Sequence, residues 1–125
     1  MAINKVKKET FGRPDRQILF HTHPSDAVGV VVSAAAGVAD DETGKKIVKA
    51  GTPLAGDLTD RTTPFTQDGA SAVGVLLHDV DVTEGDENGS LVIFGFVDLN
   101  KLDEDVVTLV TAAKDALDGK VWFLK

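Results

Sequence analysis

Residues 91–99 read LVIFGFVDL, and only Gly95 and Asp98 interrupt the apolar side chains of this stretch. Branched and aromatic residues in such a run are typical of a β-strand that is covered on both faces. We expect the core of the protein to cover one face and a neighbouring subunit to cover the other. The stretch therefore predicts a fold built around a central, buried strand.

The segment before this strand carries a hairpin signal. Residues 71–82 read SAVGVLLHDVDV, and apolar and polar residues alternate toward the end of this segment, as in a strand with two different faces. Residues 83–89 follow as a predicted loop, and its Asn88-Gly89 pair is a strong signal for a β-hairpin. We therefore predict a hairpin in which residues 71–82 lead through this loop into residues 91–99.

Further short strands are predicted along the chain. They lie at residues 18–20, 28–32, 47–50, around 63–66, and at 120–125, where KVWFLK carries the only tryptophan. Glycine, proline and polar turn residues separate these segments. Several short strands with turn signals between them are typical of a β-rich domain.

One helix is predicted, over residues 101–118. Its apolar residues fall at helical spacing, at positions 102, 106, 109, 110, 113 and 117. Asn100 is suited to cap its start and Gly119 to end it. The expected fold is thus mainly β, α+β in detail: a compact β-rich domain with one C-terminal helix followed by a terminal strand.

Charge divides the chain into two parts. The formal net charge is −7, but residues 1–16 hold five basic and two acidic side chains, so the other 109 residues carry −10. We interpret residues 1–16 as a flexible basic N-terminal arm and residues 17–125 as a single β-rich domain. Because an acidic body repels phosphate, we expect no nucleic-acid binding. No apolar stretch is long enough to predict a membrane span or a secretory signal, so we expect synthesis in the cytoplasm.

Two histidines give the strongest hint of a metal site. His21 and His23 stand in FHTHPS, and alternate residues of a strand face one side, where both rings could reach one ion. This start resembles the His-x-His-Pro motif of JAMM-type metallo-isopeptidases, which also requires a serine and an aspartate eight and eleven residues after the second histidine. Val31 and Ala34 occupy those positions. We therefore expect no metal site and no cofactor, and incidental metal binding by the two histidines stays open.

Other catalytic and ion-binding patterns are incomplete. An EF-hand loop counted from Asp79 would need glycine and glutamate where Glu84 and Ser90 stand. The chain has no cysteine, no G-x-S-x-G elbow and no phosphate-binding glycine motif. We therefore expect a protein that is not an enzyme.

Three segments nevertheless resemble a known family. They are AGTPL at residues 50–54, DGASAVGVLLHDVDVT at residues 68–83 and LVIFGFVDLNKL at residues 91–102. In order and spacing they resemble the phage head decoration, or capsid cement, proteins of the lambda D type and the related head-fibre proteins of phages of Gram-positive hosts. The residues that fill the central pattern are Asp68, Gly69, Ala72, Gly74 and Leu76.

The resemblance implies a structural role on a virion. Members of this family form trimers on the outer surface of the assembled head, at local three-fold positions, where they bind the major capsid protein and stabilise the shell. It also implies an N-terminal arm that adds a strand to the capsid protein. The arm residues that we expect to contact the capsid are Lys5, Lys7, Lys8, Phe11, Ile18 and Phe20. Two alternatives remain: a projecting head-fibre or host-surface adhesin module and, remotely, a His-x-His metallohydrolase.

Overall fold

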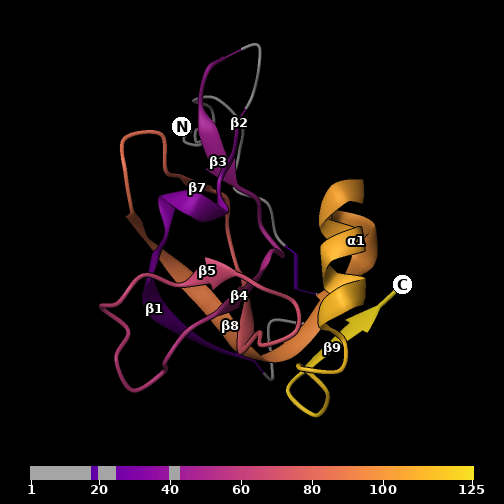
Figure 1. The fold of residues 1–125 in the computed structure, drawn as a ribbon. Coiled ribbons are helices and arrows are strands. Elements are labelled where there is room, and N and C mark those ends of the chain that lie inside the picture. The colour runs from indigo at the N-terminus through magenta and orange to yellow at the C-terminus, as the bar shows by residue number, and fades with distance from the viewer. Residues whose placement is uncertain (1–17, 20–24, 40–42) are drawn as a thin grey trace, which may run out of the picture.

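The computed structural model describes residues 18–19, 25–39 and 43–125 (Figure 1). These ranges form a mostly β protein with one α-helix and a C-terminal strand after it, as the sequence predicts. The predicted arm, residues 1–16, lies outside the described residues, so its boundary stays a prediction. The strands of the larger sheet are β1 (Asp26–Val32), β4 (Pro53–Ala55), β5 (Thr66–Gln67), β6 (Gly74–Leu76), β8 (Glu87–Asp98) and β9 (Val121–Leu124).

Strand β8 is the centre of the larger sheet. The strand order is β1-β8-β6-β4-β5, and β9 pairs with the second half of β8 in parallel. The two ends of this order meet, because Phe65, just before β5, bridges Val32 of β1. The Phe65 N–H donates to the carbonyl of Val31 at 2.8 Å, and the Ser33 N–H donates to the carbonyl of Phe65 at 2.9 Å. The sheet therefore closes into a small barrel.

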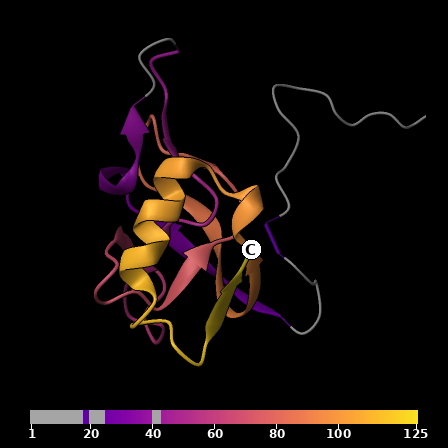
Figure 2. The same ribbon diagram turned by 90° about the vertical axis from the view of Figure 1, so that its right-hand side faces the viewer.

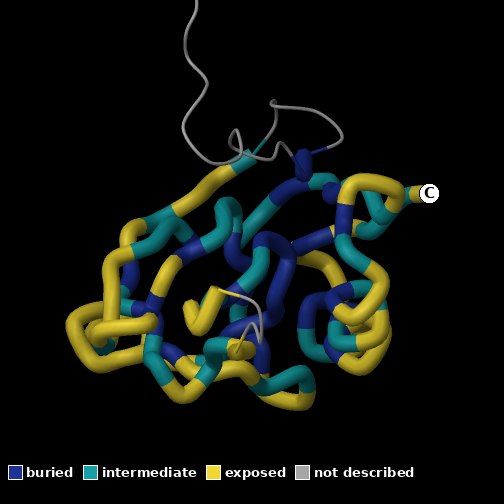
Figure 3. Tube along the Cα trace, turned by 90° about the horizontal axis from the view of Figure 1, so that it is seen from above, coloured by how far each residue is buried: buried dark blue, intermediate teal, exposed yellow. Residues whose placement is uncertain are grey.

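A smaller sheet closes one end of the barrel. Its strands are β2 (Val38–Ala39), β3 (Lys46–Val48) and β7 (Val80–Asp81), in the order β2-β3-β7. Val48 of β3 and Val80 of β7 join the barrel interior in one buried cluster, whereas Val38 of β2 is exposed. The cluster contains Val30, Val32, Val48, Leu54, Phe65, Leu76, Val80, Val82 and Leu91. In Figure 3 the buried positions gather in the middle of the molecule and the exposed positions lie in the outer loops.

Helix α1 (Glu104–Ala113) packs on the outside of the sheet (Figure 2). Its buried residues Val106, Val110 and Ala113 form a second cluster with Val92 and Val97 of β8. The helix is shorter than predicted: residues 99–101 form a separate 3-10 turn, and Asp103 rather than Asn100 precedes the first helical residue. The α-helix also ends earlier than predicted, at Ala113, and residues 114–120 continue as turns. Gly119, the predicted stop, lies in these turns with a φ of +79°, a conformation that favours glycine.

The predicted antiparallel pairing is confirmed, since Val75 and Leu76 of β6 lie opposite Val92 and Leu91 of β8, but the predicted turn at Asn88 and Gly89 is wrong. Both residues lie inside β8, opposite Val31 and Val30 of β1, and the chain turns earlier, at residues 83–86. Packing explains the glycine: a Cβ at position 89 would lie 2.9 Å from Val32 and 3.0 Å from Val80. Gly89 therefore allows strands to approach closely and does not form a turn.

The predicted single strand over residues 71–82 is also divided. Its first part is β6 in the barrel and its last part is β7 in the smaller sheet. The chain bends between them, and the Asp79 carboxylate accepts a hydrogen bond from the Ala50 N–H at 2.7 Å. The apolar-polar alternation therefore spans a bend between two sheets.

The side chains of the 91–99 stretch are divided between two buried clusters, and a register shift interrupts their alternation. Asp26 pairs with Phe94 and Ala27 with Val92, so Ile93 is the extra residue of a bulge. Leu91 belongs to the cluster inside the barrel, and Val92 belongs to the cluster beneath α1. The protein's own core thus covers side chains on both faces of the strand, and coverage by a neighbouring subunit stays a prediction.

Candidate functional site

The expected capsid contacts lie almost wholly outside the described part of the chain. They are Lys5, Lys7, Lys8, Phe11 and Phe20, and His21 and His23 lie there too. Their roles stay predictions.

Ile18 is the one expected contact that the structure describes. Its side chain is fully buried in the cluster beneath α1, and its carbonyl accepts a hydrogen bond from the Asp98 N–H at 2.8 Å. The next residue, Leu19, forms an antiparallel bridge with Val97. The Ile18 side chain is occupied within its own chain, and contacting a capsid would require it to leave this core.

The Gly-Thr-Pro-Leu segment joins the sheet to the helix. Gly51 has a φ of +92°, and a Cβ there would lie 2.5 Å from a methyl group of Leu102. Thr52 is 4% exposed, and its hydroxyl donates to the carbonyl of Lys49 at 2.6 Å. Leu54 is fully buried in the barrel. The residue types of this motif are therefore explained by packing and turn geometry.

The Asp-Gly segment that begins at residue 68 meets the same junction. The Asp68 carboxylate accepts a hydrogen bond from the Ala70 N–H at 2.9 Å. Gly69 lies against the helix, where a Cβ would be 3.2 Å from Ala112. At Gly74 a Cβ would overlap the carbonyl oxygen of Val92 in the neighbouring strand. The motifs that carry the family resemblance thus serve the fold.

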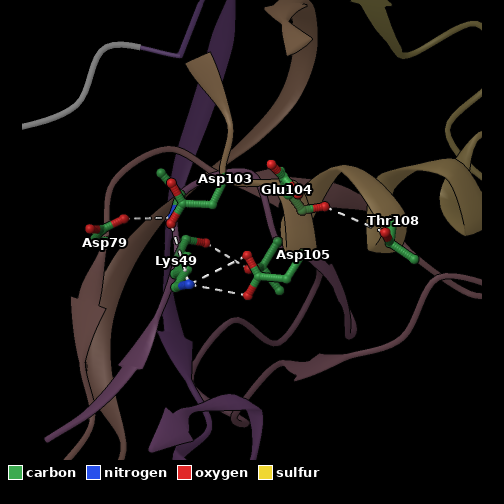
Figure 4. Close-up of polar contacts among 8 residues, drawn as sticks. Lys49, Asp79, Asp103, Glu104, Asp105 and Thr108 are labelled. Atoms are coloured by element: carbon green, nitrogen blue, oxygen red, sulfur yellow. Dashed lines mark hydrogen bonds and ion pairs between the residues drawn. The ribbon is translucent and has the colours of Figure 1, made fainter. Parts of the chain in front are cut away.

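A polar cluster surrounds Lys49 (Figure 4). Its ammonium group lies 3.1 Å from the Asp105 carboxylate and 3.3 Å from that of Asp103, at the start of α1. Hydrogen bonding to Asp105, the largest effect, raises the pKa of Lys49 above its usual value. A lysine that holds its proton so firmly is a poor nucleophile. The cluster is therefore suited to joining α1 to the end of β3.

Exposed aspartates in the loops are held by neighbouring threonines. The Thr59 hydroxyl and N–H donate to the Asp57 carboxylate at 2.6 and 2.8 Å, and Thr62 and Thr63 hold Asp60. Hydrogen bonds from the threonine side chains lower the pKa values of Asp57 and Asp60. These carboxylates therefore stay charged to lower pH than free aspartate.

Replacing Thr59 with valine is expected to raise the pKa of Asp57 part of the way to its ordinary value. The hydroxyl donor is lost, whereas the backbone N–H remains. A pKa that is lower in the folded protein than in the unfolded chain stabilises the fold at pH values above the pKa of the unfolded chain. This stabilisation is lost as the pH falls through the pKa of the folded protein. The variant should therefore lose less stability in acid. NMR titration of the Asp57 carboxyl carbon measures the shift, and Thr62→Val should leave it unchanged.

A groove of about 470 Å³ lies between the loop at residues 58–62 and strand β1. The Arg61 guanidinium donates to the carbonyl of Gly29 at 2.8 Å, and the Arg61 carbonyl accepts from the Val31 N–H at 3.3 Å. These contacts satisfy backbone groups on the outer edge of β1. The groove is thus bordered by a loop that covers a strand edge, which protects the edge from unwanted pairing.

An aromatic face lies where β9 joins β8. Trp122 stacks on Phe96 with ring centroids 5.2 Å apart and meets Phe94 edge-on at 5.4 Å. Trp122 is 37% exposed, whereas its neighbour Val121 is buried beneath α1. Alternation along KVWFLK is the sequence signal that separates the two faces of β9.

Metal and membrane sites are not evident in the described ranges. There, no three His, Asp or Glu side chains come together to hold a metal ion. Within the same ranges, no helix has the length and apolar character to cross a membrane.

Comparison with known proteins adds no family to this geometry. No protein-family model matches the chain, and a search of curated proteins gives no significant match.

Proposed function

We propose that this chain is a structural capsid decoration protein of a phage head. It binds the outer surface of the assembled shell, as a homotrimer at local three-fold positions, and stabilises the shell. The supporting observation is the convergence of the resembling segments on one part of the fold. Gly51 contacts Leu102 and Val106, Gly69 contacts Ala112 of α1, and Gly74 lies against Val92. Segments that are separate in sequence thus share one junction between sheet and helix.

The way in which the N-terminal segment enters the domain supports a binding arm. Ile18 is buried and hydrogen-bonded to Asp98 at the end of β8. Ile18 is therefore a fixed point on the central strand, close in sequence to the proposed arm. An extended segment that adds to a sheet edge gains affinity from main-chain hydrogen bonds, and its lysines suit an acidic partner. Three such arms on one trimer bind far more tightly than one.

Deleting residues 1–16 is expected to abolish binding to undecorated heads. The folded domain should keep its stability, because the buried Ile18 remains. Co-sedimentation with purified heads that lack the protein measures the bound fraction, and circular dichroism checks the fold. Lys5, Lys7 and Lys8 replaced together by arginine provide the control, which should bind. Unchanged binding of the deletion variant would show that the arm is not the contact.

Trimer formation is the second expectation of this proposal. Light scattering after size exclusion should give three times the 13.2 kDa of one chain. A clean monomer at micromolar concentration would count against a clamp at three-fold positions.

The alternative, an adhesin-type module, has one favourable observation. Asp57 and Asp60 are exposed carboxylates held rigidly by threonines, and a rigid charged loop suits recognition. The two functions separate directly, since an adhesin binds host cells and a decoration protein binds heads. Metal analysis of untagged protein addresses the metallohydrolase: one tightly held zinc per chain would support it.

A further inference from the structure

Strand β9 has an edge that no described strand pairs with. The Gly95 N–H of β8 donates to the Lys120 carbonyl, and in a parallel pair this pattern turns the amides of Trp122 and Leu124 toward β8. Phe123 therefore turns its N–H and C=O away from β8, and among the described residues neither has a partner. Val121 differs, since its N–H donates to the Leu117 carbonyl at 3.0 Å. The open edge is centred on Phe123.

We propose that this edge accepts an extended segment of another protein, with apolar residues in its middle and acidic residues at its ends. The segment adds as a strand beside β9 and places an apolar side chain over Trp122. Under the proposed function, the segment belongs to the shell protein. The source of the segment therefore rests on the proposed function, whereas its chemistry does not.

Charge identifies the ends of the segment. Lys120 and Lys125 flank β9, both are exposed, and neither has an ion-pair partner among the described residues. Within β9 itself there is no acidic residue. Like charges placed opposite each other destabilise a strand pair, so two copies of this lysine-ended strand disfavour each other. A strand that ends in aspartate or glutamate is complementary to both lysines.

The size of the aromatic face also favours a single strand over a second folded copy. Trp122 is 37% exposed. For an aromatic side chain of about 150–250 Å², this leaves less than about 100 Å² to cover. A stable interface between folded chains needs about 800 Å² from each partner. A strand that gains main-chain hydrogen bonds along an edge needs far less apolar area.

The test uses Trp122 as its own reporter, because the chain has one tryptophan and no tyrosine. The probe is an eight-residue peptide in which an alternating valine and threonine sequence stands between two terminal aspartates. The comparison peptide has the same middle and a lysine at each end. We expect the aspartate-ended peptide to shift tryptophan emission to shorter wavelength and reduce acrylamide quenching. It should bind about tenfold more tightly than the lysine-ended peptide in low salt, and the difference should shrink as salt is added.

Charge reversal at the two ends of β9 provides the decisive variant. The double change Lys120→Glu and Lys125→Glu should reverse the preference, so that the lysine-ended peptide binds better. The control, Lys101→Glu and Lys114→Glu, alters net charge equally at two other exposed lysines and should keep the original preference. Both variants change only exposed side chains, so both should fold.

The outcomes separate this inference from the proposed function. Equal binding of both peptides, or no emission change with either, overturns the inference. An emission shift that grows with protein concentration alone overturns it too, because a second copy then covers Trp122. If undecorated heads bind the Lys120→Glu, Lys125→Glu variant as well as the unchanged protein, the shell is not the source of the segment, although the decoration function stands. If neither protein binds heads but the peptide preference reverses, the proposed function fails and the strand site stands.

Discussion

Replacing Phe65 with alanine is expected to lower the free energy of unfolding by about 3–5 kcal/mol. Phe65 is fully buried, and its backbone closes the barrel through hydrogen bonds to Val31 and Ser33. Its ring also fills the space beside Gly56, where a Cβ would lie 2.6 Å from the ring. Alanine would leave a cavity at the point where the two ends of the sheet order meet. Chemical denaturation with urea, followed by circular dichroism, measures the change.

The control for this prediction is Leu58→Ala in the same loop. Leu58 is 39% exposed, so its loss should change stability by no more than about 0.5 kcal/mol. Hydrogen exchange gives a second reading: in Phe65→Ala the N–H groups of residues 65 and 33 should exchange faster relative to those of β8. A loss below about 1 kcal/mol would mean that the barrel does not depend on this ring.

Patterns within one element were enough to predict much of the fold. The apolar run at residues 91–99 identified β8, and helical spacing identified α1, although the predicted end at Gly119 lies six residues beyond the last helical residue. These signals succeed because each depends on residues that are close in sequence and belong to the same strand or helix. The mainly β class followed from them.

Features that depend on distant neighbours could not be predicted in this way. Gly89 forms a turn signal with Asn88, but glycine is required there because the side chains of Val32 and Val80, in other strands, leave no room for a Cβ. The bend near Asp79 depends on the Ala50 N–H in the same manner. Helix α1 starts late because residues 99–101 form a 3-10 turn, where the Asp98 side chain accepts from the Asn100 N–H.

The aromatic face at Trp122 was less predictable from the sequence than the fold. Whether Trp122 belongs to the core or to the outside depends on which side of β9 lies beneath α1, and only the packing of Val121 decides this. In β8 the bulge at Ile93 shifts the alternation, so Val97 rather than Phe96 joins Val92 in the cluster beneath α1. The arm contacts other than Ile18 lie outside the described residues and stay predictions.

Replacing Gly74 with alanine is expected to destabilise the protein by about 3 kcal/mol, at the upper end of the usual cost of overpacking. A Cβ at this position would overlap the Val92 carbonyl and lie 2.9 Å from Leu91. Both neighbours belong to the central strand, and Gly74 pairs with Leu54 on its other side. A backbone atom cannot move aside as a flexible side chain can, so β6 would have to separate from β8.

Gly29→Ala is the matched control, because it makes the same change in another strand of the same sheet. Nothing lies within 4 Å of a Cβ at Gly29. Alanine also restricts the unfolded chain more than glycine does, so this variant should be neutral or up to about 1 kcal/mol more stable. Urea denaturation of both variants gives the comparison. If the two lost equal stability, the cost would come from any strand glycine. A loss at Gly74 alone ties the family-like segment that holds Asp68, Gly69, Ala72 and Gly74 to the contact between β6 and β8.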